Sequence, residues 1–504
     1  MSGLPERLRG WLLLLAGAAA VTAFAPFGWF PLAFLALALL FYQWQSDTPA
    51  LAFRHGALFG LGYFGAGISW VFVSVHDYGH VPVPAAVLVT MLLVLFMLLY
   101  PALAGYVIKR LLPAPSQALL LLGFPAVWVV FEWLRGWVFS GFPWLTIGTS
   151  QIDSWLGAYA PLLGGYGCGW AVGITAAALV ALVRERQRLP ALALLAVVWG
   201  GGYLLDRVEW VQPRGAALDV LLVQGNIAQE DKWAPENLLN TFTRYAEMSF
   251  EHPGSDLVVW PETAIPAFYD RVEESFIPYL ESQLGESGTT LLTGIPVLDR
   301  QTWQYFNAVI ALGNGRTFYY KRHLVPFGEY LPLRWLIGDR LDALAVPNAD
   351  FSSGPDVQAP LQAAGYPVAA SICFEVVFNE EIRHALPAAA LLVNVSNDAW
   401  FSGSLAPHQH LEMARLRARE TGRPMLRATN TGISAIIDAR GQVLARSPQD
   451  EAAVVRGRVV PMQGATPFVR YGNVPVVVLL FACLLVAGVA GRRAAGLGNK
   501  KVKS

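Results

Sequence analysis

Eight apolar runs constrain this chain more than any other feature, because each is close to the roughly 20 residues that an α-helix needs to cross a bilayer. Seven of them precede a more polar block and one follows it. The composition agrees, with 55% hydrophobic residues, 14% charged residues and a mean hydropathy of +0.43. The sequence therefore predicts an integral membrane protein with a bundle of eight transmembrane helices. The predicted spans are residues 9–25, 27–43, 56–75, 83–108, 117–138, 161–183, 190–206 and 473–490.

Basic residues beside the spans predict the side on which each loop lies, since cytoplasmic loops carry an excess of Lys and Arg. If every run crosses, the basic clusters all fall on one side, and the loops near 26–30 and 76–82 hold no Lys or Arg. This predicts cytoplasmic termini and an external polar block, which in a bacterium is the periplasmic face of the inner membrane. The first run also resembles a cleavable signal peptide, whose removal would leave the sidedness unchanged. The clusters are Arg7 and Arg9, Arg54, Lys109 and Arg110, Arg184, Arg186 and Arg188, and Arg492, Arg493, Lys500, Lys501 and Lys503.

The polar block is long enough to bury a core of its own. Short β-branched runs alternate in it with stretches of helical character, an order that predicts a layered α/β domain. We therefore predict a transmembrane bundle over 1–208, an α/β domain over 209–470, and an eighth helix with a basic tail over 471–504. The predicted strands are 218–223, 256–260, 290–295, 307–312, 367–373, 391–395, 433–437 and 454–460, and the helical stretches include 235–250, 273–284 and 408–421.

One predicted span carries two charged residues. Glu132 and Arg135 are three positions apart, so they share a helical face near the predicted outer boundary of the membrane. Ionisable residues at such a depth usually pair with each other or line a site. Both readings stay open for this pair, a structural ion pair or a site that holds a lipid headgroup.

Cys373 is the candidate nucleophile. The chain has three cysteines, and Cys168 and Cys483 lie inside predicted membrane helices, which leaves Cys373 as the thiol of a water-facing segment. A cysteine that ends an apolar strand is often only a small buried hydrophobe. A reactive thiol needs a neighbouring base or positive charge. The residues near Cys373 therefore decide whether it is a nucleophile or a buried hydrophobic residue.

Two earlier segments supply candidate partners for this thiol. Glu262 follows the apolar strand 257–260, and a carboxylate in a partly apolar pocket has the raised pKa that a general base for a thiol requires. Lys321 follows the strand-like 317–320, and its ammonium would favour a thiolate and then stabilise an oxyanion. His323 would lie on the same side of an extended segment, so a Cys-His pair stays open as an alternative.

Further polar residues have less certain roles. Glu329 and Glu375 stand in apolar contexts and either orient Lys321 and the base or cap and pair structurally. His408 and His410 are too close together, with too few nearby ligands, for a usual metal site, so we interpret them as structural or rim residues. No metal or cofactor is expected.

The triad candidates and their flanking residues resemble the Glu-Lys-Cys triad of the nitrilase superfamily. Glu262 stands in WPE, Lys321 in YYKRHLVPFGEYLP and Cys373 in SICFE, with separations of 59 and 52 residues. With seven predicted spans before the domain and one after it, the whole chain resembles the membrane-embedded branch of that superfamily, the apolipoprotein N-acyltransferases. Further matching segments are VQGNI at 223–227, Lys232-Trp233, NVSNDAWF at 394–401 and RATNTG at 427–432.

This resemblance implies an extracytoplasmic nitrilase-like domain with an α-β-β-α sandwich fold. It implies transfer of an acyl chain, preferentially the sn-1 chain of phosphatidylethanolamine, to the α-amino group of the S-diacylglyceryl cysteine of apolipoproteins. Cys373 would attack the phospholipid ester and hold a thioester, Glu262 would be the base, and Lys321 would stabilise the oxyanion in a ping-pong cycle.

The resemblance also implies supporting roles. Glu329, Glu375 and Trp233 match positions that the family uses for catalysis or substrate placement. Phe374 stands where some members carry Tyr, and its backbone N–H is a candidate second donor to the oxyanion. A lipid substrate also makes sense of two apolar segments, 333–344 and 399–405, as candidates to dip into the bilayer or cover the site.

Two rival functions remain at this stage. A membrane-tethered nitrilase-like amidase or lipid hydrolase would use the same triad with water as the acceptor. A transporter or scaffold that kept only the fold would have lost a triad member, and all three are present. The expected partners are a phospholipid donor, a diacylated apolipoprotein acceptor and the lipid bilayer, with the protein a monomer. The net charge of zero gives no support to nucleic-acid binding.

Overall fold

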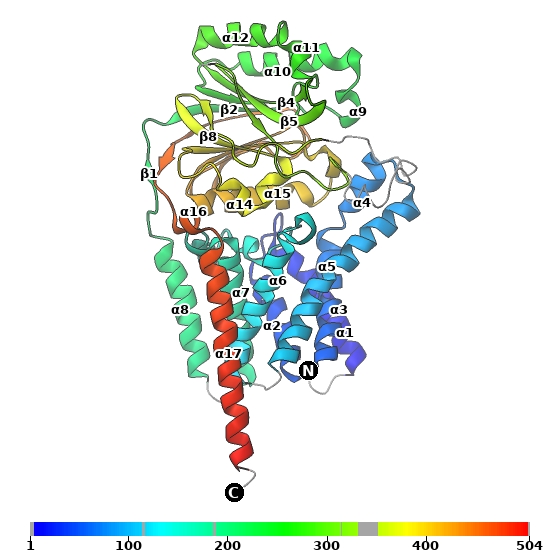
Figure 1. Ribbon diagram of the computed structural model, residues 1–504, viewed down its shortest axis with the longest axis vertical. Coiled ribbons are helices and arrows are strands. Elements are labelled where there is room, and N and C mark those ends of the chain that lie inside the picture. The colour runs from blue at the N-terminus through cyan, green and yellow to red at the C-terminus, as the bar shows by residue number, and fades with distance from the viewer. Residues whose placement is uncertain (1–4, 113–115, 185–187, 314, 331–350, 502–504) are drawn as a thin grey trace. The chain divides into compact units, whose positions relative to one another are not determined.

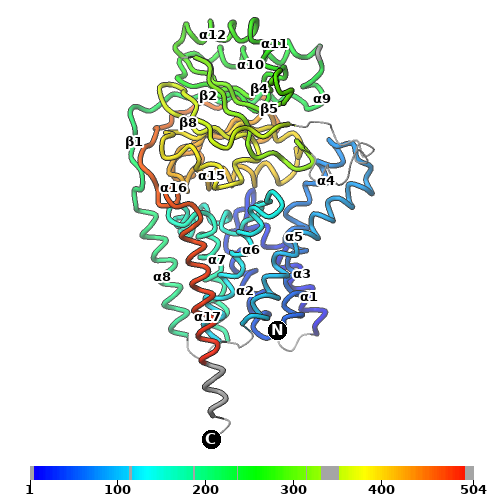
Figure 2. The backbone as a smooth tube through the Cα atoms, in the orientation of Figure 1, coloured from blue at the N-terminus to red at the C-terminus, as the bar shows by residue number. Residues whose placement is uncertain are grey.

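The computed structural model describes the whole chain except residues 1–4, 113–115, 185–187, 314, 331–350 and 502–504. The chain divides into two compact units, and Figure 2 traces the backbone through each of them. We call the first the helical unit, which comprises Met1–Phe72, Val83–Val208 and Tyr471–Ser504. The second is the sheet unit, which comprises Val73–Pro82 and Glu209–Arg470. The predicted cover segment 333–344 lies outside the described residues.

Eight helices among the described residues of the helical unit overlap the predicted spans (Figure 1). Three helical segments, Val83–Leu111, Trp155–Arg184 and Val474–Arg493, are long and apolar enough to cross a membrane, within the described residues. The prediction of eight spanning helices is therefore confirmed only in part. The helices are α1 (Glu6–Ala20), α2 (Pro31–Ser46), α3 (Pro49–Gly67), α5 (Val83–Leu111), α6 (Phe124–Arg135), α7 (Ala160–Arg184), α8 (Leu189–Leu205) and α17 (Val474–Lys501).

Glycines let helices of this unit touch backbone to backbone. A Cβ atom at Gly62 of α3 would lie 1.9 Å from the carbonyl oxygen of Leu14 in α1. A Cβ atom at Gly56 of α3 would lie 2.4 Å from the carbonyl oxygen of Pro101 in α5. Both distances are far too short for any side chain, so α3 packs closely on two neighbours only because these residues are glycines.

The third predicted span, 56–75, is wrong as a single straight helix. Helix α3 ends at Gly67, and the next helical segment, Val71–Tyr78, is bent from it by 57°. The residues from Val73 to Pro82 belong to the sheet unit, where the Ser74 hydroxyl donates to the Trp400 carbonyl at 2.7 Å. The ring of Tyr78 packs edge-on against Trp400, with centroids 6.0 Å apart. The break therefore follows from packing against residues more than 300 positions away.

Two six-stranded sheets form the centre of the sheet unit (Figure 1). Their strand orders are β13-β2-β3-β4-β5-β6 and β12-β11-β10-β9-β8-β7, and the central strands β2 to β4 and β8 to β10 are parallel. The first sheet contains β2 (Leu218–Gln224), β3 (Leu257–Val259), β4 (Thr290–Asp299), β5 (Gln304–Leu312), β6 (Thr317–Tyr320) and β13 (Ala453–Val459). The second contains β7 (Leu361–Ala363), β8 (Tyr366–Ile372), β9 (Leu391–Ser396), β10 (Met425–Thr429), β11 (Ala435–Ile437) and β12 (Val443–Arg446).

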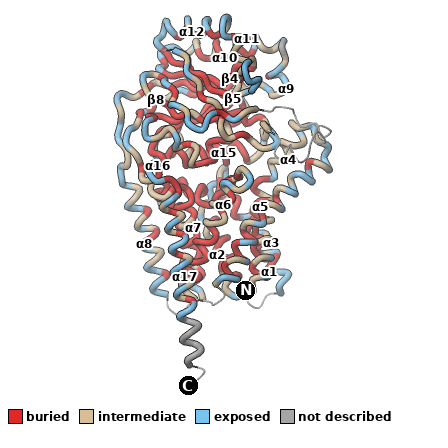
Figure 3. The backbone as a smooth tube through the Cα atoms, in the orientation of Figure 1, coloured by how far each residue is buried: buried red, intermediate tan, exposed pale blue. Residues whose placement is uncertain are grey.

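The alternation of side chains along each strand builds the layers. In β2, Val220 and Leu222 enter the core between the sheets, whereas Leu221 and Val223 pack on the outer face with residues of α10 (Leu238–Phe250) and α12 (Phe276–Ser287). Helix α15 (Ala406–Thr421) covers the second sheet, and Figure 3 shows it buried. The unit is thus an α-β-β-α sandwich, as predicted.

Candidate active site

The three predicted triad residues follow the ends of three different strands of the sheet unit. Glu262 lies three residues after β3, and Lys321 and Cys373 directly follow β6 and β8. The Lys321 Nζ atom is 3.8 Å from the Glu262 Oε1 atom, and the charges of both residues act on the Cys373 thiol. Chain segments more than 100 residues apart therefore bring a carboxylate, an ammonium and a thiol together at one place, as layered α/β folds do at strand ends.

Glu329 and an asparagine complete the surroundings of the carboxylate and the ammonium. Lys321 donates to Glu329 Oε1 at 2.7 Å, and the backbone N–H of Val325 donates to Glu329 Oε2 at 2.8 Å. The side-chain amide of Asn307 donates to Glu262 Oε1 at 2.7 Å and to Glu329 Oε1 at 3.3 Å. The predicted supporting residue Glu329 is thus in place to fix Lys321.

Burial and neighbouring charges set the protonation states of the site. Burial raises the pKa of Glu262, and Lys321 opposes this rise. Burial alone would lower the pKa of Lys321, but the carboxylates of Glu329 and Glu262 outweigh it and the pKa is raised. Burial and Glu262 raise the pKa of Cys373 to about 12. The resting site therefore holds a neutral thiol beside a charged lysine, and the thiol needs a base to take its proton as it attacks.

Cys373 sits on a strained turn between strand β8 and a 3₁₀ helix, Cys373–Val377. Its φ angle is +52°, in the left-handed region that costs a non-glycine residue on the order of 1–3 kcal/mol. A turn of this kind lifts the side chain clear of the sheet edge, as required of a nucleophile. The surrounding structure must hold the turn in place.

The side chain of Glu375 stabilises this turn through several hydrogen bonds. It is almost fully buried, and its Oε2 atom accepts from the Ile372 N–H at 2.7 Å. Its Oε1 atom accepts from the N–H groups of Arg322 and His323 at 2.7 and 3.1 Å, and the Tyr319 hydroxyl lies 3.0 Å from both oxygens. One carboxylate thus ties the residue before the nucleophile to the two residues after Lys321.

Comparison with known proteins places both parts of the chain in described families. Residues 16–178 match the apolipoprotein N-acyltransferase N-terminal domain, and residues 220–463 match the carbon-nitrogen hydrolase family. The apolipoprotein N-acyltransferase of Methylococcus capsulatus is 47% identical over 489 residues, which cover 96% of each chain. That of Nitrosomonas europaea is 42% identical over 505 residues, covering 98% of this chain and 100% of the relative. That of Coxiella burnetii is 39% identical over 479 residues, covering 94% and 99%.

The chain belongs to the apolipoprotein N-acyltransferase family. The resemblance recognised from the motifs is confirmed, and with it a membrane protein that is an acyltransferase with a carbon-nitrogen hydrolase domain. The remaining predicted residues can now be placed in this acyltransferase.

The alternative base His323 makes other contacts. Its ring stacks on Phe378, with centroids 3.7 Å apart, and its Nδ1 atom is 3.9 Å from Glu381. The Phe374 ring packs edge-on against the same Phe378 at 5.1 Å. These contacts favour Lys321 over His323 as the partner of the thiol. Trp233 is half exposed at the end of α9 (Gln229–Lys232), so its supporting role stays a prediction.

Two residues close to the carboxylate had no role assigned from the sequence: Lys232, noted there only as part of a matching segment, and Asn307. Lys232 is 3% exposed, and its ammonium donates to the Glu262 carbonyl at 2.9 Å. Burial lowers its pKa to about 8, although the negative charges of Glu262 and Cys373 act to raise it. The pair Lys232-Trp233 stood out in the sequence, but the neighbouring polar residues gave no sign that the lysine is buried. Asn307 had a weak signal, as the polar residue at the start of an apolar strand.

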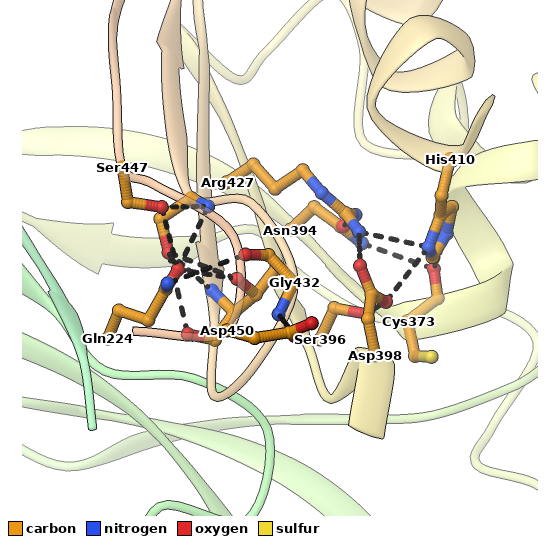
Figure 4. A network of polar contacts seen from close by, with 12 residues as sticks. Gln224, Cys373, Asn394, Ser396, Asp398, His410, Arg427, Gly432, Ser447 and Asp450 are labelled. Carbon is orange, nitrogen blue, oxygen red and sulfur yellow. Dashed lines mark hydrogen bonds and ion pairs between the residues drawn. The ribbon is translucent and has the colours of Figure 1, made fainter. Parts of the chain in front are cut away.

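A group of four polar residues, none of them given a catalytic role from the sequence, lies beside the nucleophile and is shown in Figure 4. Asn394, Asp398, His410 and Arg427 are all buried and bonded to one another, and two of them reach the Cys373 carbonyl. Of the two interpretations left open for His410, a structural residue or a rim residue, the second is wrong, because His410 is 1% exposed. Its burial depends on α15 packing against the sheet, which no local pattern reveals.

Glu132 and Arg135 of α6 are buried and bond to their own chain. The Ile147 N–H donates to Glu132 Oε1 at 2.8 Å, and Arg135 donates to the carbonyls of Phe142, at 2.8 Å, and Trp144. The two side chains are 3.9 Å apart. They fold the loop after α6 back onto its end, and a role in holding a lipid headgroup stays a prediction.

A metal centre has no candidate ligand set within the described parts of the chain. No group of three or more His, Cys, Asp and Glu side chains there is placed to hold an ion.

Proposed function

We propose that this protein transfers a fatty acyl chain, the sn-1 chain of phosphatidylethanolamine, to the N-terminal α-amino group of the S-diacylglyceryl cysteine of apolipoproteins. The observation that carries the proposal is the set of Glu262, Lys321 and Cys373, brought together in a chain that is up to 47% identical to proteins of this name. This transfer completes lipoprotein maturation.

The first half-reaction acylates the enzyme. Glu262 takes the thiol proton of Cys373 while the sulfur attacks the ester carbonyl carbon. The oxyanion that forms is stabilised by the Lys321 ammonium and the N–H of Phe374. The intermediate collapses to a thioester, and the departing lysophospholipid alkoxide takes the proton from Glu262.

The second half-reaction returns the thiol. The α-amine of the diacylated lipoprotein attacks the thioester carbonyl and passes a proton to Glu262. The C–S bond breaks, the amide forms, and the leaving thiolate recovers the proton, so that the cycle is ping-pong and needs no co-reactant. Lys321 stays charged throughout, because the carboxylates around it raise its pKa.

A lipid donor also explains why this domain is joined to apolar helices, since both substrates carry chains that reside in a bilayer. We propose that all eight helices cross the bacterial inner membrane, with both termini cytoplasmic and 209–470 periplasmic. The protein acts as a monomer. Labelling single cysteines introduced at His80 and at Arg110 in intact cells would test the sidedness, since only the first should react with an impermeant reagent.

One rival function has its own support. The match of 220–463 to the carbon-nitrogen hydrolases favours a hydrolase that passes the acyl group to water. Transfer and hydrolysis are separated by incubating the full-length protein with phosphatidylethanolamine, labelled in its sn-1 chain, and a synthetic diacylated lipopeptide. We expect the label in an amide at the lipopeptide α-amine. Label released only as free fatty acid would establish the hydrolase instead.

A further inference from the structure

A polar row crosses three neighbouring parallel strands behind the nucleophile. Ser371 of β8 pairs with Asn394 of β9, which pairs in turn with Arg427 of β10. Their neighbours Ile372, Val393, Val395, Leu426 and Ala428 belong to the core between the sheets. Because side chains alternate along a strand, the row lies on the opposite face.

Arg427 organises the buried groups on this face. Its guanidinium donates to Asn394 Oδ1 and, at 2.8 Å, to Asp398 Oδ2. Burial would raise the pKa of Asp398, but Arg427 and His410 lower it to about 2, so Asp398 is ionised. Both side chains of the Asp398–Arg427 ion pair are fully buried, so loss of either partner would leave an uncompensated charge in the interior.

His410 connects this ion pair to the nucleophile. Its Nε2 atom is 3.3 Å from the Cys373 carbonyl oxygen, which only accepts, so Nε2 carries the hydrogen. Its Nδ1 atom lies 3.1 Å from Asp398 Oδ1 and 2.9 Å from Arg427 Nη2, so both members of the ion pair contact this side of the ring. The Asp398–Arg427 ion pair therefore holds the imidazole ring so that Nε2 faces the nucleophile's backbone.

A second donor reaches the same oxygen. The side-chain amide of Asn394 is 3.4 Å from the Cys373 carbonyl and 3.0 Å from the Ser371 hydroxyl. The Cys373 carbonyl is therefore approached by donors from β9 and α15. In Figure 4, His410 and Asn394 lie toward Cys373, with Arg427 beside both of them.

The Cys373 carbonyl and the Phe374 N–H belong to one peptide plane. In a trans peptide the two groups point in opposite directions, so fixing the carbonyl fixes the direction of the N–H. We infer that His410, together with Asn394, is a positioning residue that aims the Phe374 N–H at the oxyanion of both half-reactions. The inference rests on the proposed function, because it gives that N–H its task.

His410 contributes to the reaction by aligning the Phe374 N–H with the oxyanion. A donor misdirected by a small rotation of the peptide plane is lost to the transition state, where oxyanion donors act most strongly. The ground state of the bound phospholipid carries no such charge. Loss of His410 should therefore slow acylation without weakening phospholipid binding.

The test compares substitutions of His410 that keep or remove its donor. In His410→Gln the longer amide can still donate to the carbonyl, whereas His410→Asn is too short and His410→Met has no donor. His408→Met is the matched control, since His408 lies two residues away on the same helix and is only half-buried. The full-length proteins are mixed with phosphatidylethanolamine vesicles, and thioester formation at Cys373 is timed by intact mass.

We expect His410→Met and His410→Asn to form the thioester about tenfold or more slowly at saturating phospholipid, with the half-saturating concentration within about twofold of wild type. His410→Gln should recover most of the rate, and His408→Met should match wild type. The Asn and Gln variants carry the same amide, so this pair decides the matter even if His410→Met does not fold.

Three results would overturn the inference. One is a His410→Asn rate equal to wild type. Another is an equal fall in the rate of thioester formation in the Asn and Gln variants. The third is a variant whose half-saturating phospholipid concentration rises while its rate at saturation stays at the wild-type value. In each of these cases wild type still forms a thioester. If wild type forms none, the proposed function itself fails and the inference falls with it.

Discussion

Exchange of Glu375 for glutamine removes one oxygen from the carboxylate that joins the nucleophile turn to the residues after Lys321. The Glu375 side chain accepts from three backbone N–H groups and from the Tyr319 hydroxyl. Glutamine has nearly the same shape but offers only one acceptor oxygen. Its amide nitrogen must therefore face at least one backbone N–H that now has no acceptor.

The hydrogen bonds of Glu375 show which orientation of the glutamine amide leaves fewer buried N–H groups without an acceptor. With the nitrogen in the Oε1 position, the N–H groups of Arg322 and His323 both lose their acceptor. With the nitrogen in the Oε2 position, only the Ile372 N–H does. One buried unsatisfied donor costs about 1–3 kcal/mol, and we expect the second orientation. Because Ile372 directly precedes Cys373, the cost falls on the turn that carries the thiol.

Two measurements follow for Glu375→Gln. The rate of thioester formation with phosphatidylethanolamine should fall by about 5- to 150-fold, the equivalent of 1–3 kcal/mol. The thermal midpoint of the sheet unit should fall by roughly 2–4 °C for each kcal/mol. Glu380→Gln is the matched control, a partly exposed glutamate five residues further on. Glu375→Gln with wild-type rate and midpoint would refute the assignment of Glu375 as the holder of the turn.

Three further predictions concern protonation. Ionised Glu262 is the base and burial raises its pKa, so the rate of thioester formation should rise with pH through a limb above the ordinary value of 4.5; a limb at or below 4.5 would contradict this. Burial lowers the pKa of Lys232 to about 8, so the wild-type rate should fall above about pH 8 as its charge is lost. The Lys232→Met variant should form the thioester more slowly and show no fall in rate above pH 8. If the fall persists in this variant, another group causes it. With a pKa of about 12, Cys373 should react slowly with iodoacetamide at pH 7 and faster up to pH 10 without levelling off, whereas a plateau below pH 9 would show a lower thiol pKa.

The helices were predictable where apolar runs alone decide them. The predicted spans 83–108 and 161–183 correspond to α5 (Val83–Leu111) and α7 (Ala160–Arg184). The break after Gly67 was not predictable, because the residues that follow are as apolar as those before it. It depends on contacts of Ser74 and Tyr78 with Trp400, which exist only in the folded sheet unit.

The residues of the candidate active site also fall into those that the sequence predicts and those that only the folded structure shows. Glu262, Lys321 and Cys373 could be found because each is an unusual residue at the end of an apolar strand within a recognisable motif. Lys232 and His410 could not, since their importance comes from burial beside the other residues. A charged or polar residue looks the same in sequence whether it faces water or a buried carbonyl, and only the packing of α9 and α15 distinguishes the two.

Intact mass of the purified full-length protein after incubation with phosphatidylethanolamine alone tests the central claim most directly. We expect a mass gain of one acyl chain, lost on addition of a diacylated lipopeptide and absent from Cys373→Ala. A Cys373→Ala protein that still acylated the lipopeptide at the wild-type rate would contradict it.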